Sequence, residues 1–143
     1  MTEALAQARK GALEGEVPVG AVVVLNDEVI AVAHNRPITL SDPTAHAEIL
    51  ALREAGFTAG SYRLTDAALY VTIEPCVMCI GATVNARIAR LIFGARDEKA
   101  GAAGSVYDIG RDGRLNHRIE IQSGVMESEC AEIMREFFRQ RRG

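Results

Sequence analysis

The chain has 143 residues and is 48% hydrophobic, which matches the size and composition of one globular domain. No apolar run reaches the ~18 residues of a membrane helix, and Met1–Ala4 does not begin a secretion signal, so we expect a cytoplasmic protein. The net charge of −3 does not by itself suggest nucleic acid, and three cysteines argue against a disulfide framework.

Apolar side chains recur at helical spacing in some segments and form short β-branched or alternating runs in others. The elements expected in chain order are a helix at 3–14, strands at 19–25 and 29–33, a loop at 35–42, a helix at 44–55, irregular chain at 57–67, a strand at 68–72, a helix at 75–86, a strand at 90–93, a glycine-rich segment at 94–117 with room for one short helix, a strand at 118–122 and a helix at 126–142. This order predicts an α/β layer sandwich that forms a single domain over residues 1–143.

Turn and cap residues mark several boundaries. Asn26-Asp27 predicts the turn of a hairpin between the first two strands. The second helix has Asp42 or Thr44 as its expected cap, with Pro43 at the first helical position. Gly56 is the expected end of that helix.

Three soft metal ligands lie in two short segments near prolines. Cys76 and Cys79 are three residues apart at the start of an expected helix, so both thiols face one side, where the helix dipole favours thiolates. His46 lies at the start of the preceding expected helix. Catalytic zinc has three protein ligands and a water, whereas structural zinc has four. The pattern therefore predicts a catalytic zinc site, whose coordinated water has a pKa of roughly 7.

Other roles and ligands remain open for this pattern. A Cys-x-x-Cys pair alone also suits redox chemistry or half of a structural zinc site. Cys130 could be a fourth ligand, although its place in the last expected helix favours a packed apolar thiol. His34 and His117 are further candidates, and each is also explained by a satisfied or a substrate-facing histidine.

Glu48 lies two residues after His46, and no lysine or arginine follows it until Arg53. A carboxylate beside zinc can act as a general acid and base that takes a proton from the zinc-bound water and passes it to the substrate. The alternative role is to orient His46 or to support the helix dipole.

The two segments resemble a known signature. His46-Ala47-Glu48 with Pro75-Cys76-Val77-Met78-Cys79 is similar to the H-x-E…P-C-x-x-C pattern of zinc-dependent nucleoside and nucleobase deaminases. Further segments resemble the bacterial tRNA-specific adenosine deaminases, namely 16–21, 34–38, 42–48, 93–97, 101–105, 115–118 and 137–142. The resemblance implies a cytidine deaminase-like fold, with a three-layer α/β/α sandwich around a five-stranded mixed sheet. It also implies a homodimer that converts adenosine to inosine at the wobble position of a tRNA anticodon.

The resemblance also assigns roles to individual positions. It implies one catalytic zinc ion per subunit and a nucleoside held by an amide, which presents donors and an acceptor. The roles implied are zinc ligands for His46, Cys76 and Cys79, the proton shuttle for Glu48, a nucleoside contact for Asn35 and a place near the substrate for Asp97. A turn role remains the alternative for Asn35, and a turn or cap role remains the alternative for Asp97.

Positive charge is concentrated at the end of the chain. Residues 135–143 contain four arginines and one glutamate, so this end carries +3 and the rest carries −6. A solvated last helical turn that complements the helix dipole is one explanation. A tRNA anticodon stem-loop is the other, because a base that leaves its stack requires the flanking backbone to be held. Arg139, Arg141 and Arg142 are therefore candidates for phosphate contacts.

Two other functions compete with tRNA deamination. A deaminase of free nucleobases or nucleosides, of the guanine or cytosine type, would not need the basic end or the segment 93–105. A non-catalytic RNA-binding module with a structural zinc would need four protein ligands and would tolerate Glu48→Ala.

Overall fold

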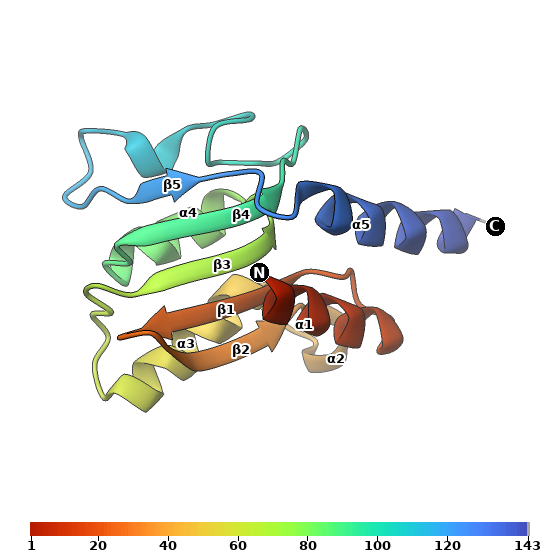
Figure 1. Cartoon of the computed structure of the whole chain (residues 1–143), viewed down its shortest axis with the longest axis horizontal. Helices are drawn as coiled ribbons and strands as arrows, with labels where there is room; N and C mark the ends of the chain where they lie inside the picture. The colour runs from red at the N-terminus through yellow and green to blue at the C-terminus, as the bar shows by residue number, and fades with distance from the viewer. Residues whose placement is uncertain (143) are drawn as a thin grey trace.

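The computed structural model describes residues 1–142, and its centre is a mixed five-stranded sheet (Figure 1). The strands are β1 (Gly20–Leu25), β2 (Glu28–His34), β3 (Ala68–Ile73), β4 (Arg90–Ala95) and β5 (Glu120–Gln122). They lie in the order β2-β1-β3-β4-β5. β1 pairs antiparallel with β2 and β3, whereas the β3–β4 and β4–β5 pairs are parallel. The five-stranded mixed sheet expected from the resemblance is confirmed.

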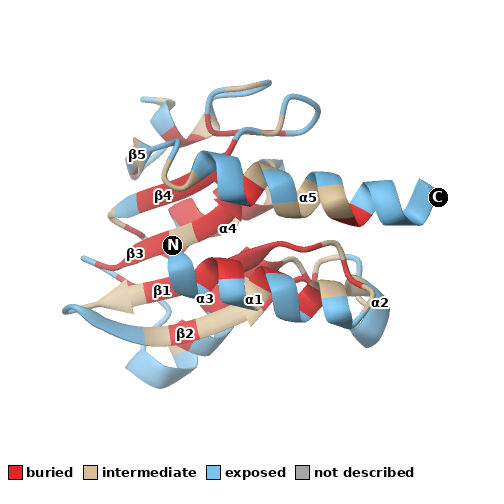
Figure 2. Ribbon diagram, turned by 45° about the vertical axis from the view of Figure 1, so that its right-hand side comes forward, coloured by how far each residue is buried: buried red, intermediate tan, exposed pale blue. Residues whose placement is uncertain are grey.

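Helices cover both faces of the sheet (Figures 1 and 2). α1 (Thr2–Leu13) and α5 (Glu127–Arg142) contact each other and lie on one face. α3 (Ala47–Ala59) and α4 (Val77–Asn85) contact each other on the opposite face. This arrangement is the expected three-layer α/β/α sandwich. None of the helices within residues 1–142 is long and apolar enough to cross a lipid bilayer.

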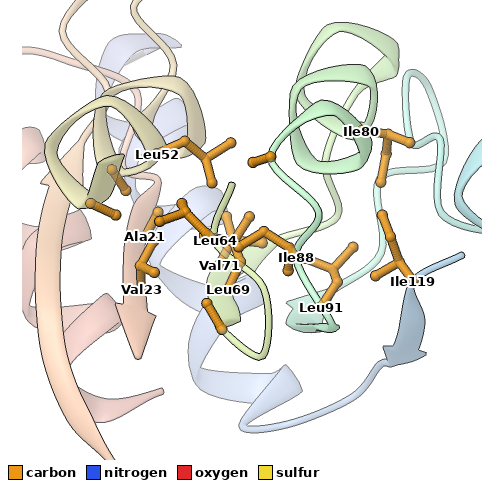
Figure 3. Close-up of a cluster of buried hydrophobic side chains, with 14 of the residues drawn as sticks. Ala21, Val23, Leu52, Leu64, Leu69, Val71, Ile80, Ile88, Leu91 and Ile119 are labelled. Atoms are coloured by element: carbon orange, nitrogen blue, oxygen red, sulfur yellow. The ribbon is translucent and has the colours of Figure 1, made fainter. Parts of the chain in front are cut away.

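The main core lies between the sheet and the α3–α4 layer (Figure 3). Leu69 and Val71 of β3 pack there with Leu52 of α3 and Ile80 of α4, and all four side chains are buried. A smaller cluster on the opposite face joins α1 and α5 through Leu5 and Cys130. The sheet therefore holds the starts of α3 and α4 in fixed positions relative to each other.

The hairpin between β1 and β2 is confirmed. Asn26 and Asp27 both adopt positive φ angles, of 53° and 62°. Two consecutive residues in this region give the tight turn whose twist matches the flanking strands, and asparagine and aspartate tolerate it well.

The loop expected at 35–42 contains a short helix, α2 (Pro37–Leu40), so this prediction was wrong in part. The carboxylate of Glu16 accepts hydrogen bonds from the backbone N–H groups of Ile38 and Thr39, at 3.3 and 2.7 Å. A buried carboxylate from a distant segment thus satisfies the first turn of α2. Local sequence gives no sign of such a partner.

The second predicted helix begins three residues later than expected. Its cap is His46 rather than Asp42 or Thr44, and α3 starts at Ala47. Asp42 instead accepts hydrogen bonds from the backbone N–H and the hydroxyl of Thr44, at 2.8 and 2.7 Å. Its side chain therefore closes a local turn before the helix, which is the common alternative use of aspartate.

Three further boundaries differ. α3 passes through the expected stop at Gly56 and ends at Ala59, with Gly60 as its cap at a φ of 67°. α4 begins at Val77 with Cys76 as its cap, two residues after Pro75. The glycine-rich segment contains the expected short helix, η1 (Ile109–Arg111), and β5 starts at Glu120 rather than at 118.

Candidate metal centre and active site

The three predicted metal ligands converge at the N-termini of two helices. His46 caps α3 and Cys76 caps α4, while Cys79 lies one turn into α4. The Nδ1 atom of His46 lies 3.4 Å from Sγ of Cys79 and 3.6 Å from Sγ of Cys76. All three ligand atoms lie within 4.8 Å of one another. The fold thus brings together residues that are 30 and 33 positions apart in the chain.

The geometry and chemistry of this group fit a zinc ion. Bonds of ~2.0 Å to nitrogen and ~2.3 Å to sulfur at a tetrahedral angle place the two atoms about 3.5 Å apart. The observed separations of 3.4 and 3.6 Å agree with that value. No other histidine, cysteine, aspartate or glutamate of residues 1–142 joins the group. Three soft ligands can hold the ion and leave one coordination position to a water or a substrate.

The thiols of Cys76 and Cys79 differ in how readily they lose a proton. Hydrogen bonds from Cys79 and His46 lower the pKa of Cys76 to about 3. The same pairing, together with burial, raises the pKa of Cys79. The hydrogen bond with Cys76 raises the pKa of His46. A metal ion that binds thiolates and a neutral imidazole must therefore displace protons from this group.

Glu48 lies in the first turn of α3, directly beside the ligand cluster. Its side chain is only 3% exposed, and this burial is the main reason that its pKa is raised. The carboxylate of Glu48 also contributes to the raised pKa of Cys79. No salt bridge to Glu48 is present within the described chain. A raised pKa suits a group that must both accept and release a proton.

Asn35 is buried next to the metal centre, and the structure reveals a structural task for it. Its Oδ1 atom accepts a hydrogen bond of 2.7 Å from the backbone N–H of Ala47, the residue after His46. Asn35 therefore fixes the first turn of α3. Its Nδ2 group donates no hydrogen bond to any residue of 1–142, so the donor end remains available to a ligand. The predicted nucleoside contact is compatible with this task, which is to hold the start of α3 rather than to form a local turn.

Asp97 lies in the loop that follows β4, and its carboxylate is used locally. It accepts hydrogen bonds from the backbone N–H groups of Lys99 and Ala100, at 3.0 and 3.1 Å. This is the turn role that the sequence left open. The prediction that Asp97 lies near the substrate therefore does not depend on contacts of its carboxylate. It depends on the position of the whole loop, which is held against the metal-ligand segment.

The reasoning from sequence missed two buried carboxylates that hold the loops around the site. Glu16 supports α2, and Glu74 accepts hydrogen bonds from the chain between Asp97 and Ser105. Burial raises the pKa of each carboxyl group, but these hydrogen bonds outweigh it and leave the pKa below its ordinary value. The signal available for Glu74 was its position directly before the ligand segment that begins Pro75-Cys76.

The remaining candidate ligands have other partners. Nε2 of His34 lies 2.7 Å from the carboxylate of Glu14, and Nε2 of His117 lies 2.7 Å from the carbonyl oxygen of Ile88. Cys130 is buried between α1 and α5, on the face of the sheet opposite α3 and α4. These residues are satisfied or packed side chains, as the alternative interpretation held.

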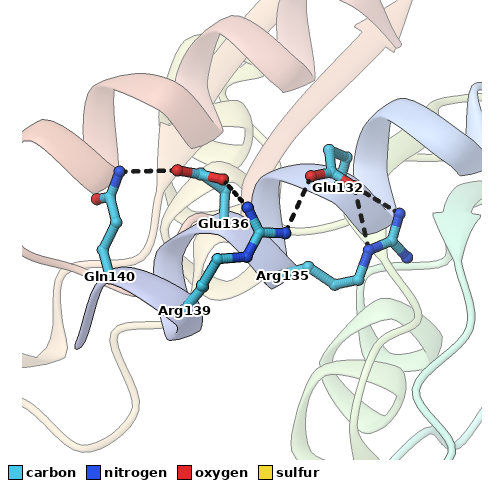
Figure 4. Close-up of polar contacts among 5 residues, drawn as sticks. All are labelled: Glu132, Arg135, Glu136, Arg139 and Gln140. Atoms are coloured by element: carbon cyan, nitrogen blue, oxygen red, sulfur yellow. Dashed lines mark hydrogen bonds and ion pairs between the residues drawn. The ribbon is translucent and has the colours of Figure 1, made fainter. Parts of the chain in front are cut away.

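The arginines of α5 form an ion-pair ladder along the helix (Figure 4). Arg139 lies 2.6 Å from Glu136 and 3.5 Å from Glu132. Arg135 lies 2.7 Å from Glu132, and Gln140 donates a hydrogen bond of 3.0 Å to Glu136. Arg139 is therefore bound to two acids of its own helix.

The other two predicted phosphate contacts differ from Arg139. Arg141 donates a hydrogen bond of 2.6 Å to the carbonyl oxygen of Gly15, and its guanidinium lies 4.5 Å from the ring centre of Phe137. Arg142 is exposed and has no acidic partner among residues 1–142. The end of α5 projects beyond the sheet on the side where β3 and β4 end (Figure 1). The Cys76 segment follows β3 on that side, so the basic end and the metal centre share one end of the molecule.

The model of the MafB19-like deaminase family matches residues 1–142. Together with the fold and the three-ligand group, this match defines the class of protein as a deaminase.

Similar proteins indicate which kind of deaminase this is. The chain is 46% identical to the tRNA-specific adenosine deaminase of Bacillus subtilis, over 99% of this chain and 88% of the relative. It is 48% identical to the tRNA-specific adenosine deaminase of Haemophilus influenzae, over 99% and 83%. A solved tRNA:A34 deaminase, described in work on A-to-I editing at the wobble position, superposes with a TM-score of 0.90 at 47% identity, over 93% of this chain and 96% of that one. The chain belongs to the family of the tRNA-specific adenosine deaminases.

Proposed function

We propose that this chain hydrolyses adenosine to inosine at the wobble position of a tRNA anticodon. The observation that carries the proposal is the group of His46, Cys76 and Cys79 with the buried carboxylate of Glu48 beside it. The identity of 46% with a tRNA-specific adenosine deaminase over nearly the whole chain supports the choice of substrate. The proposed unit is a single domain over 1–143, of which Gly143 lies outside the described residues.

The residues of the site divide the chemistry among them. His46, Cys76 and Cys79 would hold a zinc ion, which supplies a nucleophile by lowering the pKa of a coordinated water to about 7. Glu48 accepts a proton from the attacking water and transfers it to the purine ring. It then takes the second proton, from the new hydroxyl group on the ring carbon, and passes it to the amino group, which leaves as ammonia when the C–N bond breaks. Asn35 donates from its free Nδ2 group to the nucleoside while its Oδ1 atom keeps the start of α3 in place. The overall reaction consumes water and releases ammonia.

The proposed partner is the anticodon stem-loop. Arg139, Arg141 and Arg142 would contact its phosphates at the end of the molecule that carries the metal centre. Such an enzyme works where tRNA is found, so we place it in the cytoplasm.

We also propose that the chain forms a homodimer through the outer surface of α3 and α4. A groove of about 760 Å³ lies there, lined by residues that include Leu52, Ala82 and Ala86. Two aromatic side chains of the same groove are exposed, Phe57 at 90% and Tyr62 at 76%. A large aromatic side chain beside an apolar groove is the arrangement that two copies can satisfy reciprocally about a two-fold axis.

The test is to incubate the purified protein with an anticodon stem-loop that has adenosine at position 34 and to measure inosine. Glu48→Gln provides the matched control, because it preserves shape and removes the proton shuttle. We expect it to retain zinc, measured by elemental analysis, and to lower kcat by about 10²–10⁴-fold. Full activity of this variant, or no inosine from the wild type, would refute the proposal.

A guanine deaminase is the second candidate, because the guanine deaminase of Nitrosomonas europaea superposes with a TM-score of 0.83 at 25% identity. Free guanine, cytosine and adenosine therefore belong in the same assay. Turnover of a free base that equals turnover of the stem-loop would favour this alternative.

A further inference from the structure

Glu74 follows β3 and is two residues before the metal ligand Cys76, and its side chain is only 2% exposed. One carboxylate oxygen, Oε1, accepts a hydrogen bond of 3.2 Å from the backbone N–H of Asp97 and another from the hydroxyl of Ser105. The other oxygen, Oε2, accepts hydrogen bonds from the backbone N–H groups of Ala103 and Ser105, at 2.9 and 3.0 Å. All of these donors belong to one segment, residues 97–105, which we term the 97–105 loop.

The loop is wound closely around this carboxylate. The backbone N–H of Ala102 donates a hydrogen bond of 2.8 Å to the carbonyl oxygen of Pro75, which is adjacent to Cys76. A Cβ atom at Gly101 would collide with the carboxyl group of Glu74 and would lie 2.6 Å from the carbonyl oxygen of Asp97. Only glycine lets the backbone approach the carboxylate this closely. The 97–105 loop is therefore fixed directly to the segment that carries a metal ligand.

We infer that Glu74 is a positioning residue, which holds the 97–105 loop against the metal-ligand segment and so shapes the substrate side of the site. None of its hydrogen bonds runs to His46, Cys76 or Cys79, so its target is the loop rather than the metal centre. A carboxylate accepts hydrogen bonds only, and four donors from one loop match that property. This inference rests on the proposed function, because the loop is expected to contact the stem-loop.

The variant Glu74→Gln tests the inference with little change in volume. The amide oxygen can keep the hydrogen bonds from Ala103 and Ser105, and the amide nitrogen can then donate to the Ser105 hydroxyl. In that orientation the nitrogen faces the N–H group of Asp97, so two donors oppose each other. Glu74→Gln therefore releases the Asp97 end of the loop. Ser105→Ala is the milder variant, because it removes only the hydroxyl.

Gly101→Ala perturbs the same contact from the side of the loop, and it replaces Glu74→Gln should that variant fail to fold. For both variants we expect the zinc content per chain to equal that of the wild type. We expect the KM for the stem-loop to rise about tenfold and kcat to change less than about threefold, since substrate contacts rather than the proton shuttle are displaced. Ser105→Ala should raise KM by about two- to threefold.

Amide hydrogen exchange of the free protein gives a readout that does not depend on activity. We expect exchange within 97–105 to accelerate about tenfold in Glu74→Gln and Gly101→Ala, with α3 unchanged. Unchanged exchange and KM would overturn the inference, and so would loss of zinc or a fall in kcat at constant KM. If the wild type made no inosine, the proposed function would fail, whereas the exchange data would still decide whether Glu74 holds the loop.

Discussion

The metal centre and the end of α5 both carry charged groups that are expected to act on RNA, but different kinds of interaction hold these groups in place. His46 is 30 and 33 residues from the two cysteines, and α3 and β3 lie between their positions in the chain. Arg139 pairs with Glu136 and Glu132, both on its own helix. Tertiary packing fixes the first group, and local pairing in solvent fixes the second.

This difference determines how each region responds to change. Surface ion pairs contribute only about 0–1 kcal/mol and rearrange readily, so an arginine of α5 can exchange a glutamate for a phosphate. Ligands that are at least half-buried, share protons and lie beside a buried carboxylate have no such freedom. We therefore expect substitutions at the metal centre to abolish function and substitutions at the end of α5 to adjust affinity.

The largest effect is expected from Cys79→Ala, which removes a buried ligand from the centre. With two ligands left, zinc should be lost, and deamination should fall by more than about 10³-fold. Elemental analysis and inosine formation measure the two losses separately. Cys130→Ala is the matched control, since that thiol packs between α1 and α5, and it should keep full zinc content. A Cys79→Ala protein with wild-type zinc would refute the ligand assignment.

At Asn35, two substitutions distinguish the contact that holds the start of α3 from the proposed contact with the nucleoside. Asn35→Asp keeps an acceptor for the N–H of Ala47 but loses the Nδ2 donor, whereas Asn35→Ala loses both. We expect kcat/KM to fall about 10- to 100-fold in both variants, because the nucleoside contact is absent from both. Only Asn35→Ala should also lose about 1 kcal/mol of unfolding free energy, measured by urea denaturation. A fully active Asn35→Asp would remove the substrate role.

Much of the fold and the metal centre could be predicted because the determining signals are short. The hairpin depended on Asn26-Asp27, and the ligand set depended on residue type and spacing. The start of α3 was misplaced because Asp42 and Thr44 are good caps in isolation, yet they bond to each other. The actual cap, His46, takes that position through Asn35, which lies 12 positions from its hydrogen-bond partner Ala47.

The supporting carboxylates could not be found in the same way. Glu16 and Glu74 act through backbone N–H groups 22 to 31 residues further along the chain. Within residues 1–142, neither has a cation partner whose position in the sequence would have indicated it. Residue type alone does not distinguish a buried acceptor from a solvated glutamate, so these contacts appear only once the chain is folded.

A smaller effect, on the pH dependence of stability, is expected from substitution of Glu16. Burial raises its pKa, but hydrogen bonds from Thr39 and Ile38 leave the pKa below the ordinary 4.5. A lowered pKa in the folded state means that this stabilisation is present above about pH 4.5 and is lost as the pH falls through the folded value. Glu16→Gln should lower the Tm at pH 7 by about 5 °C and make the fall in Tm below pH 4.5 shallower. The exposed Glu28→Gln should change neither, and parallel acid limbs for the wild type and Glu16→Gln would contradict the prediction.

The smallest effects are expected at the end of α5, where the three arginines should differ. Replacing Arg139, Arg141 and Arg142 together by glutamine should weaken stem-loop binding and flatten its salt dependence, by up to about 0.7–0.9 in slope per phosphate contact. Among single variants, Arg142→Gln should lose the most, since it has no acidic partner within residues 1–142. Arg139→Gln should lose the least, because that side chain must first leave Glu136.

A substitution of the glutamate that pairs with Arg139, rather than of the arginine itself, tests the same contrast with the metal centre. Glu136→Gln frees Arg139 from its nearer partner, so binding should strengthen about two- to threefold at low salt, with kcat unchanged. The control is Arg90→Gln, at the start of β4 and thus at the end of the sheet away from the basic helix end. Stem-loop binding is titrated at several salt concentrations. Equal salt slopes for the wild type and the variant without Arg139, Arg141 and Arg142 would show that these arginines stabilise their helix and do not contact phosphates.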